Sequence, residues 1–201
     1  TSTELLQTII MSVIKAAKAA LRKELKAKLN SLSSGEKARQ SVIVQQKTLH
    51  HELYKRSQRV SIFLSMNDEI QTEPILRHAL ETGKTFYQFF FYFMTPNNNR
   101  EEYESLPVTK WQIKQPPLDK QCDKALSSGG LDLILIPGLA FSKEGHRMGR
   151  GRGYYDTYLT KCRESQSQPP STVALAFKEQ ILPEIPTEDT DMPIDIILTA
   201  D

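Results

Sequence analysis

Residues 145–156 read Gly-His-Arg-Met-Gly-Arg-Gly-Arg-Gly-Tyr-Tyr-Asp and combine residue types that could bind and hold an anion. Within this segment three glycines alternate with two arginines over residues 149–153. A glycine-rich loop that runs into a helix exposes backbone N–H groups at the positive end of the helix dipole. Arginine adds permanent positive charge and planar donors that suit phosphate oxygens. The segment therefore predicts an anion site, and phosphate is the anion we expect.

The sequence on either side gives this loop a place in an α/β fold. Residues 131–136 form an apolar run, interrupted only by Asp132 and followed by Pro137 and Gly138, which is typical of a buried parallel strand. Residues 154–164 have the composition of a short helix. Ligands of open α/β sheets bind beyond the carboxyl ends of the strands. The loop matches neither a Walker A sequence nor G-x-G-x-x-G, so the motif alone leaves a flexible basic surface loop as the alternative.

Carboxylates near this loop could hold a divalent cation. Asp156 follows the glycines directly, and the acidic segment 188–195 could supply a second carboxylate. Mg²⁺ binds to one or two carboxylates and completes its shell with phosphate oxygens and water. The alternative is that Asp156 caps its helix and the acidic segment is a solvated loop.

Other polar residues could contact a ligand from elsewhere in the chain. Lys18 and Arg22 are four residues apart on a predicted helix and point the same way, although a basic helix face is usually only solvated. Glu69 follows a predicted strand, where a substrate-orienting carboxylate or a simple loop acid would lie. His146 is better interpreted as an exposed loop histidine than as a general acid or base. Trp111 could stack on a flat heterocycle or pack in the core.

Periodicity predicts the elements that position these residues. Amphipathic helices are expected over residues 14–30, from the capping box at 33–36 toward Tyr54, and over 72–80. The predicted strands cover residues 59–65, 85–93, 131–136, 172–176 and 194–198. Strands separated by helices indicate an α/β fold with a mostly parallel central sheet flanked by helices.

Composition limits the class of protein. The 201 residues fit one domain, and the net charge of +2 lacks the basic excess of a dedicated nucleic-acid-binding protein. An RNA-associated module stays a lesser alternative because of the basic helix near the N-terminus. The two cysteines lack metal-site spacing and form no disulfide framework, which favours a cytoplasmic protein. No apolar run is long enough to span a membrane. Residues 1–10 are expected to be an extension, which could be disordered, before a single domain from Met11 to Asp201.

Several segments together resemble the 5-formyltetrahydrofolate cyclo-ligase family, also called 5,10-methenyltetrahydrofolate synthetases. The matching segments are 18–22 (Lys-Ala-Ala-Leu-Arg), 61–70 (Ser-Ile-Phe-Leu-Ser-Met-Asn-Asp-Glu-Ile), 111–116, 128–138, 149–156, 174–180 and 191–195. The glycine block followed by Tyr-Tyr-Asp is the most specific of them. The resemblance implies a three-layer Rossmann-like fold. It also implies an enzyme that uses Mg-ATP to convert 5-formyltetrahydrofolate into 5,10-methenyltetrahydrofolate, releasing ADP and phosphate.

The same resemblance implies roles for individual residues. ATP would contact Lys18, Arg22, Met148, Gly149, Arg150, Gly151, Arg152, Gly153, Tyr154 and Tyr155. The folate substrate would contact Arg22, Leu64, Glu69, Trp111, Arg150, Gly151, Arg152, Gly153 and Tyr154. Arg150, Arg152 and Tyr154 would act on the reacting groups, and Asp156 and Asp191 would be the Mg²⁺ ligands. The expected partners are these small molecules alone, with no nucleic acid and no membrane, and the chain is expected to be a monomer.

One segment departs from the family pattern. Residues 86–99 are rich in aromatic side chains and lack the family's recognisable turn after the second strand. Because that segment contributes to the folate pocket in the family, the alternative function is a homologue that binds folate or nucleotide with impaired catalysis.

Overall fold

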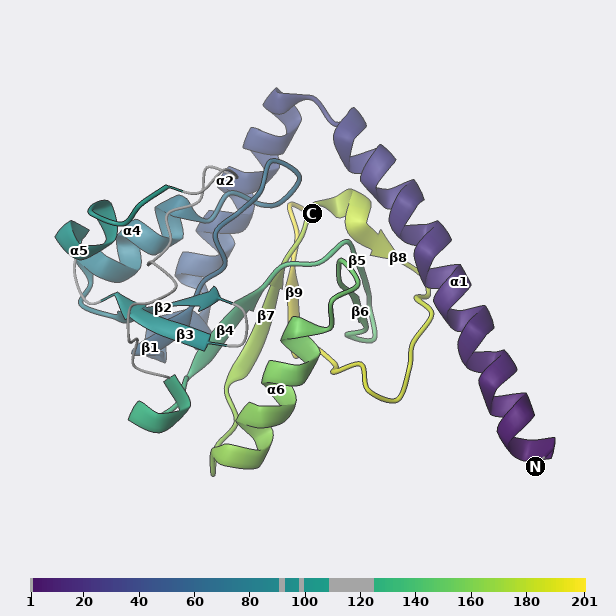
Figure 1. The fold of residues 1–201 in the computed structure, drawn as a ribbon. Helices are drawn as coiled ribbons and strands as arrows, with labels where there is room; N and C mark the ends of the chain where they lie inside the picture. The colour runs from purple at the N-terminus through teal and green to yellow at the C-terminus, as the bar shows by residue number, and fades with distance from the viewer. Residues whose placement is uncertain (1, 91–92, 98–99, 109–124) are drawn as a thin grey trace.

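The computed structural model describes residues 2–90, 93–97, 100–108 and 125–201, and a mostly parallel sheet forms its centre (Figure 1). Within these residues the sheet has six strands in the order β3-β2-β1-β4-β7-β9. The strands are β1 (Arg59–Ser61), β2 (Thr85–Phe90), β3 (Phe93–Asn97), β4 (Leu133–Ile136), β7 (Ser171–Leu175) and β9 (Ile196–Leu198). Every neighbouring pair is parallel except β2 and β3. The predicted α/β class is confirmed.

Strand β4 shows why the sheet is covered on both faces. Its four residues are all buried, as expected of an apolar strand in a parallel sheet. Leu133 and Leu135 belong to one core cluster, whereas Ile134 and Ile136 belong to the other, because successive side chains point to opposite faces. The first cluster packs against α2 (Ser34–His50), α3 (Glu52–Arg56) and α4 (Glu73–Glu81), and the second packs against α6 (Tyr154–Ser165). The result is a three-layer arrangement.

Helix α1 (Ser2–Ser31) runs along one side of the molecule, and its N-terminal end extends beyond the body (Figure 1). Leu25 and Leu29 near its C-terminal end are fully buried in the first core cluster. The part that contains residues 5–13 leaves its large apolar side chains exposed. Residues 2–10, which we expected to form an extension that could be disordered, are helical, and the domain boundary at Met11 stays a prediction.

A second, smaller sheet lies beyond the central one and was not predicted. Its strands are β5 (Ala140–Ser142), β6 (Arg147–Met148) and β8 (Ile181–Leu182), in the order β6-β5-β8. Helices η2 (Lys178–Gln180), η1 (Ala125–Ser128) and α5 (Arg100–Glu104) are short and complete the described elements. The β5–β6 hairpin stands between β4 and the glycine loop, so the loop follows β6 rather than leaving β4 directly.

Several element boundaries differ from the sequence predictions, and the strand predicted over 59–65 ends already at Ser61. The helix predicted to run toward Tyr54 is interrupted at His51, which is extended and whose ring accepts a hydrogen bond from the Leu53 N–H. The strand predicted over 85–93 ends at Phe90, and the chain returns as the antiparallel strand β3. Pro96 fits there because β3 is an edge strand. Within the described part of the chain, no helix has the length and hydrophobicity needed to cross a membrane.

Candidate active site

A cavity of about 870 Å³ opens beyond the carboxyl ends of two neighbouring strands, β1 and β4. The chain crosses from β1 to β2 on one side and from β4 to β7 on the other, so the strand order reverses between them. Open α/β sheets bind ligands at this kind of switch point. The loop after β1 lines the cavity with Phe63, Leu64 and Met66, and the loop after β4 lines it with Pro137 and Gly138.

The glycine loop forms one wall of the cavity and leads into α6. Gly151 has a φ of 102° and Gly153 a φ of 66°, so both have left-handed conformations that side chains with a Cβ rarely adopt. Gly153 caps α6, and the N–H of Thr157 makes the first helical bond, to the Gly153 carbonyl. The N–H groups in the first turn of a helix lack intrahelical acceptors. The loop therefore leads into the positive end of the α6 dipole, as the sequence pattern predicts.

Arg150 joins the glycine loop to the loop that follows β1. Its Nη2 donates to Asp68 Oδ1 at 2.7 Å and to Glu69 Oε1 at 3.0 Å. Glu69 is only 5% exposed, and its other oxygen accepts the Met66 N–H at 2.9 Å. Burial raises the pKa of Glu69, and the charge of Arg150 opposes that shift. Arg150 therefore keeps a buried carboxylate at the cavity wall paired with a cation.

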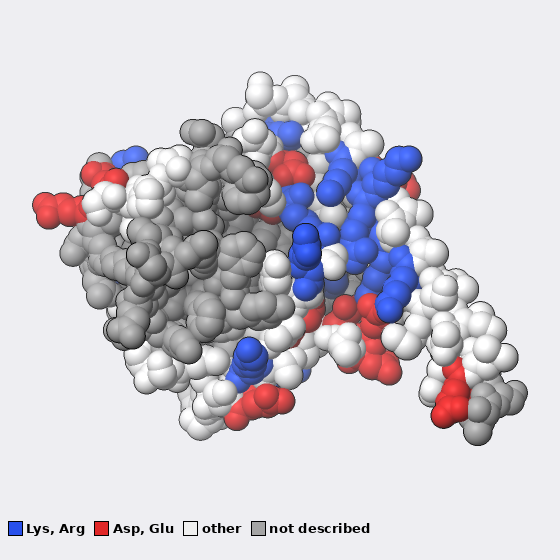
Figure 2. All heavy atoms as spheres, viewed as in Figure 1, with Lys and Arg blue, Asp and Glu red and all other residues white. Residues whose placement is uncertain are grey.

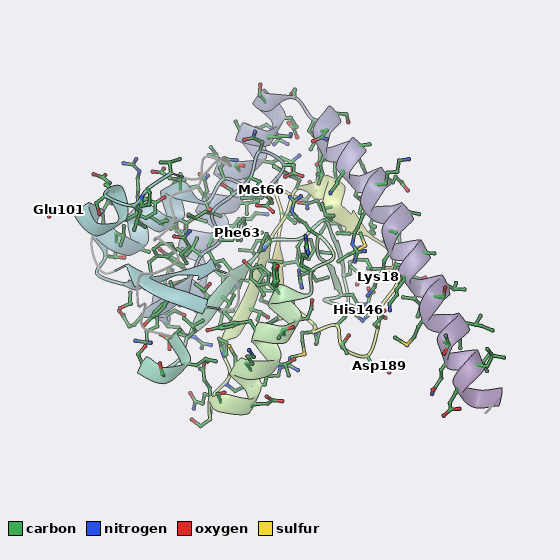
Figure 3. All side chains as sticks on the ribbon, in the orientation of Figure 1. Lys18, Phe63, Met66, Glu101, His146 and Asp189 are labelled. Carbon is green, nitrogen blue, oxygen red and sulfur yellow. The ribbon has the colours of Figure 1, made fainter. Side chains whose placement is uncertain are left out.

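Helix α1 contributes two cations to the cavity lining, and one of them contacts the glycine loop. Arg22 donates from Nε to the Gly149 carbonyl at 3.0 Å, and its guanidinium lies against Gly151. Lys18 lies on the side of α1 that faces the body (Figure 3) and is 4% exposed. Its Nζ donates to Glu188 Oε2 at 2.9 Å and to Asp191 Oδ2 at 2.5 Å. Burial acts to lower the pKa of Lys18, but the hydrogen bonds and negative charges of Asp191 and Glu188 together raise it, so Lys18 is a cation.

Asp156 and Asp191, the predicted Mg²⁺ ligands, come from neighbouring segments. Asp156 Oδ2 accepts from Arg147 Nη2 at 2.8 Å, and its Oδ1 accepts the Met192 N–H at 3.2 Å. The second bond brings the segment of Asp191 next to Asp156. Each carboxylate already faces a cation, Arg147 or Lys18. Both side chains offer hard carboxylate oxygens, which are the donors that Mg²⁺ prefers.

The described residues contain no group of three or more His, Cys, Asp or Glu side chains arranged to hold a metal by themselves.

The structure brings the predicted site residues together around one cavity. Its lining includes Lys18, Arg22, Leu64, Glu69, Asp191 and the whole segment 148–156. Trp111 lies outside the described residues. His146 is exposed in the turn between β5 and β6, away from the cavity lining, as the sequence indicated. Figure 2 shows Lys and Arg side chains gathered along α1 and beside it, with acidic side chains below them. The individual roles of these residues stay predictions.

Three further charged residues belong to this site: Arg147 and Asp68, which were not predicted from the sequence, and Glu188, which was predicted only as part of the acidic segment 188–195. Arg147 has a side chain only 4% exposed, its guanidinium lies over the Tyr155 ring, and a Cβ on Gly149 would come within 2.8 Å of it. Asp68 shares Arg150 with Glu69, and Glu188 shares Lys18 with Asp191. Arg147 was detectable as the first basic residue of a series that continues in the glycine loop. The pairings of Asp68 and Glu188 depend on long-range contacts.

Comparison with known proteins decides the family. The model of the 5-formyltetrahydrofolate cyclo-ligase family matches residues 14–200. The 5-formyltetrahydrofolate cyclo-ligase of Mus musculus is 46% identical over 194 residues, which cover 94% of this chain and 96% of the mouse chain. This chain belongs to the 5-formyltetrahydrofolate cyclo-ligase family. The resemblance stated from the motifs is confirmed.

Other members of the cyclo-ligase family extend the similarity in sequence and in fold. A probable 5-formyltetrahydrofolate cyclo-ligase of Caenorhabditis elegans is 36% identical and covers 94% of this chain and 95% of its own length. The solution structure of Aquifex aeolicus 5,10-methenyltetrahydrofolate synthetase is 24% identical, with a TM-score of 0.73. That alignment covers 92% of this chain and 90% of the Aquifex chain. The fold of the family is therefore the fold of this chain.

Proposed function

We propose that this cyclo-ligase converts 5-formyltetrahydrofolate into 5,10-methenyltetrahydrofolate while ATP is converted to ADP and phosphate. The observation that carries the proposal is the cavity at the switch point between β1 and β4. Its walls combine the glycine loop, the start of α6 and the cations of α1. Family membership at 46% identity to the mouse enzyme supports the same activity.

The reaction must remove the formyl oxygen of the substrate, which is a poor leaving group. The formyl oxygen of an N-formyl group would have to depart as hydroxide, which is a weak leaving group. Transfer of the γ-phosphoryl group of ATP to that oxygen converts it into a phosphate ester. N10 of the same molecule then attacks the formyl carbon and loses its proton to solvent, and the C–O bond breaks as phosphate departs. N10 and the formyl carbon already lie close within one molecule, so positioning supplies much of the rate acceleration.

The residues of the glycine loop would stabilise charge on the transferred phosphoryl group. Preorganised donors aimed at developing charge are the main source of catalysis in phosphoryl transfer. Backbone N–H groups of the loop, Arg150 and Arg152 are suited to this task, because all of them line the cavity at the start of α6. Tyr154 is the first residue of α6 and lines the same wall. Lys18 and Arg22 would hold the remaining phosphates from the α1 side.

We propose Mg²⁺ as the metal, with Asp156 and Asp191 as its protein ligands. The cation would neutralise phosphate charge when it is bound. Arg147 would keep Asp156 oriented through their ion pair, which is 2.8 Å long. Glu69, which pairs with Arg150, would orient the folate, and Leu64 would contact it, since both residues line the cavity. We also propose a cytoplasmic monomer that acts on small molecules alone.

Formation of the methenyl product, followed by its near-ultraviolet absorbance, tests this function. The chain is expected to turn over only when 5-formyltetrahydrofolate, ATP and Mg²⁺ are all present. Binding of both substrates would be measured in parallel by calorimetry. A folded chain that binds both substrates without turnover would contradict the proposal. It would favour the alternative of an impaired homologue, with residues 86–99 as its cause.

A further inference from the structure

Lys18 depends on two carboxylates from a segment far away in the sequence. Its side chain is 5% exposed, and its ammonium contacts Glu188 and Asp191 across the gap between α1 and the segment before β9. A lysine side chain has large rotamer freedom, so a fixed ammonium position requires partners that restrain it. Glu188 and Asp191 together fix the position of the Lys18 ammonium.

Asp191 has two tasks that compete once a metal binds. Its Oδ2 accepts from Lys18 Nζ and also from the Glu188 N–H at 2.8 Å. In the proposed function the same carboxylate is a ligand of Mg²⁺. A divalent cation at Asp191 repels the neighbouring ammonium, because like charges a few ångströms apart oppose each other strongly in a partly buried site. Asp191 alone would then hold Lys18 poorly.

Glu188 is built to take over this task. The N–H of Glu188 binds the Asp191 carboxylate, and the N–H of Asp191 donates to the Glu188 carbonyl at 2.9 Å. This closed turn directs both carboxylates toward Lys18. The Glu188 side chain is 24% exposed and lines the cavity. Asp189, between them in sequence, is exposed and does not line the cavity (labelled in Figure 3).

We propose that Glu188 is a positioning residue for nucleotide binding, which holds the Lys18 ammonium in the cavity while Asp191 is engaged by the metal. The proposal rests on the proposed function, since it assumes that Lys18 meets the phosphates and that Asp191 meets Mg²⁺. Glu188 acts through Lys18 and touches neither reacting group. Its contribution is therefore largest when the metal is present.

Glu188→Ala and a matched control, Asp189→Ala, test this role. Because the hydrogen bond involves two charged groups, Glu188→Ala is expected to raise the KM for ATP about tenfold, with the KM for 5-formyltetrahydrofolate unchanged. Calorimetric titration with ATP is expected to show a similar loss of affinity with Mg²⁺ and a clearly smaller loss in EDTA, where Asp191 still holds Lys18. Asp189→Ala should match the wild type, and Glu188→Asp should restore part of the affinity.

Three results would overturn the role. Glu188→Ala could match Asp189→Ala, it could weaken ATP binding equally with and without Mg²⁺, or it could raise both KM values while lowering the thermal midpoint, as a purely structural residue would. Failure of the proposed function is distinguished because it removes turnover from the wild type itself. If the wild type turns over, the proposed function stands, and the variants then test only the role of Glu188.

Discussion

Replacement of Arg150 with alanine is expected to lower kcat/KM for 5-formyltetrahydrofolate by about 10²- to 10³-fold, the range found when a donor to developing charge is removed. Two effects combine in this variant. The phosphoryl group loses a permanent cation, and the Glu69 carboxylate loses the guanidinium that contacts it at 3.0 Å. Initial rates of methenyl formation at saturating ATP would measure the loss.

The pH dependence of the same variant gives a second expected result. Burial raises the pKa of Glu69 and Arg150 counteracts this, so the pKa should rise further without Arg150. If ionised Glu69 orients the folate, the residual activity should disappear at a higher pH than in the wild type as the solution is acidified. Arg163→Ala, an exposed arginine on α6, is the control and should keep full activity. An Arg150→Ala enzyme with wild-type rates would remove Arg150 from the site.

Replacement of Asp156 with asparagine is expected to raise the Mg²⁺ concentration for half-maximal rate by about 10- to 100-fold and to lower kcat as well. The amide lacks the charge that a hard divalent cation prefers, and it also releases Arg147. Initial rates would be measured while Mg²⁺ is varied at constant free ATP.

Glu164→Gln provides the matched control for Asp156. Glu164 lies on the same helix, lines the same cavity and loses the same charge, but it is exposed and lies two turns further along α6. Its Mg²⁺ dependence should stay that of the wild type. An Asp156→Asn enzyme with unchanged Mg²⁺ dependence, or a Glu164→Gln enzyme with the same shift, would contradict the assignment of Asp156 as a ligand.

The central sheet could be predicted from the sequence because its strands carry strong local signals. The apolar run that contains β4 is bounded by Gly130 and Pro137, and it can be buried only between two layers of helices. The small sheet β6-β5-β8 could not be predicted, because its strands have two or three residues and the pairing of β5 with β8 joins positions far apart in sequence. Strand β3 was missed for a related reason, since Pro96 argues against a strand unless its place at an edge is known.

The parts of the site that lie close together in sequence could be predicted. The parts that depend on contacts between distant segments could not. The glycine loop is detectable because three glycines and the start of a helix lie within a few residues. The salt bridge of Lys18 with Asp191 joins positions 173 residues apart, and no periodicity connects them. The burial of Arg147 could not be predicted either, because a strand of two residues is too short to give a pattern of buried and exposed positions.

The fate of the formyl oxygen tests the central claim most directly. 5-Formyltetrahydrofolate labelled with ¹⁸O in the formyl group would be converted by the wild-type chain with ATP and Mg²⁺, and the released phosphate would be analysed by mass spectrometry. Phosphoryl transfer to the formyl oxygen predicts one ¹⁸O atom in each phosphate, in step with methenyl formation. Unlabelled phosphate alongside methenyl product, or phosphate release without product, would contradict the proposed reaction at this site.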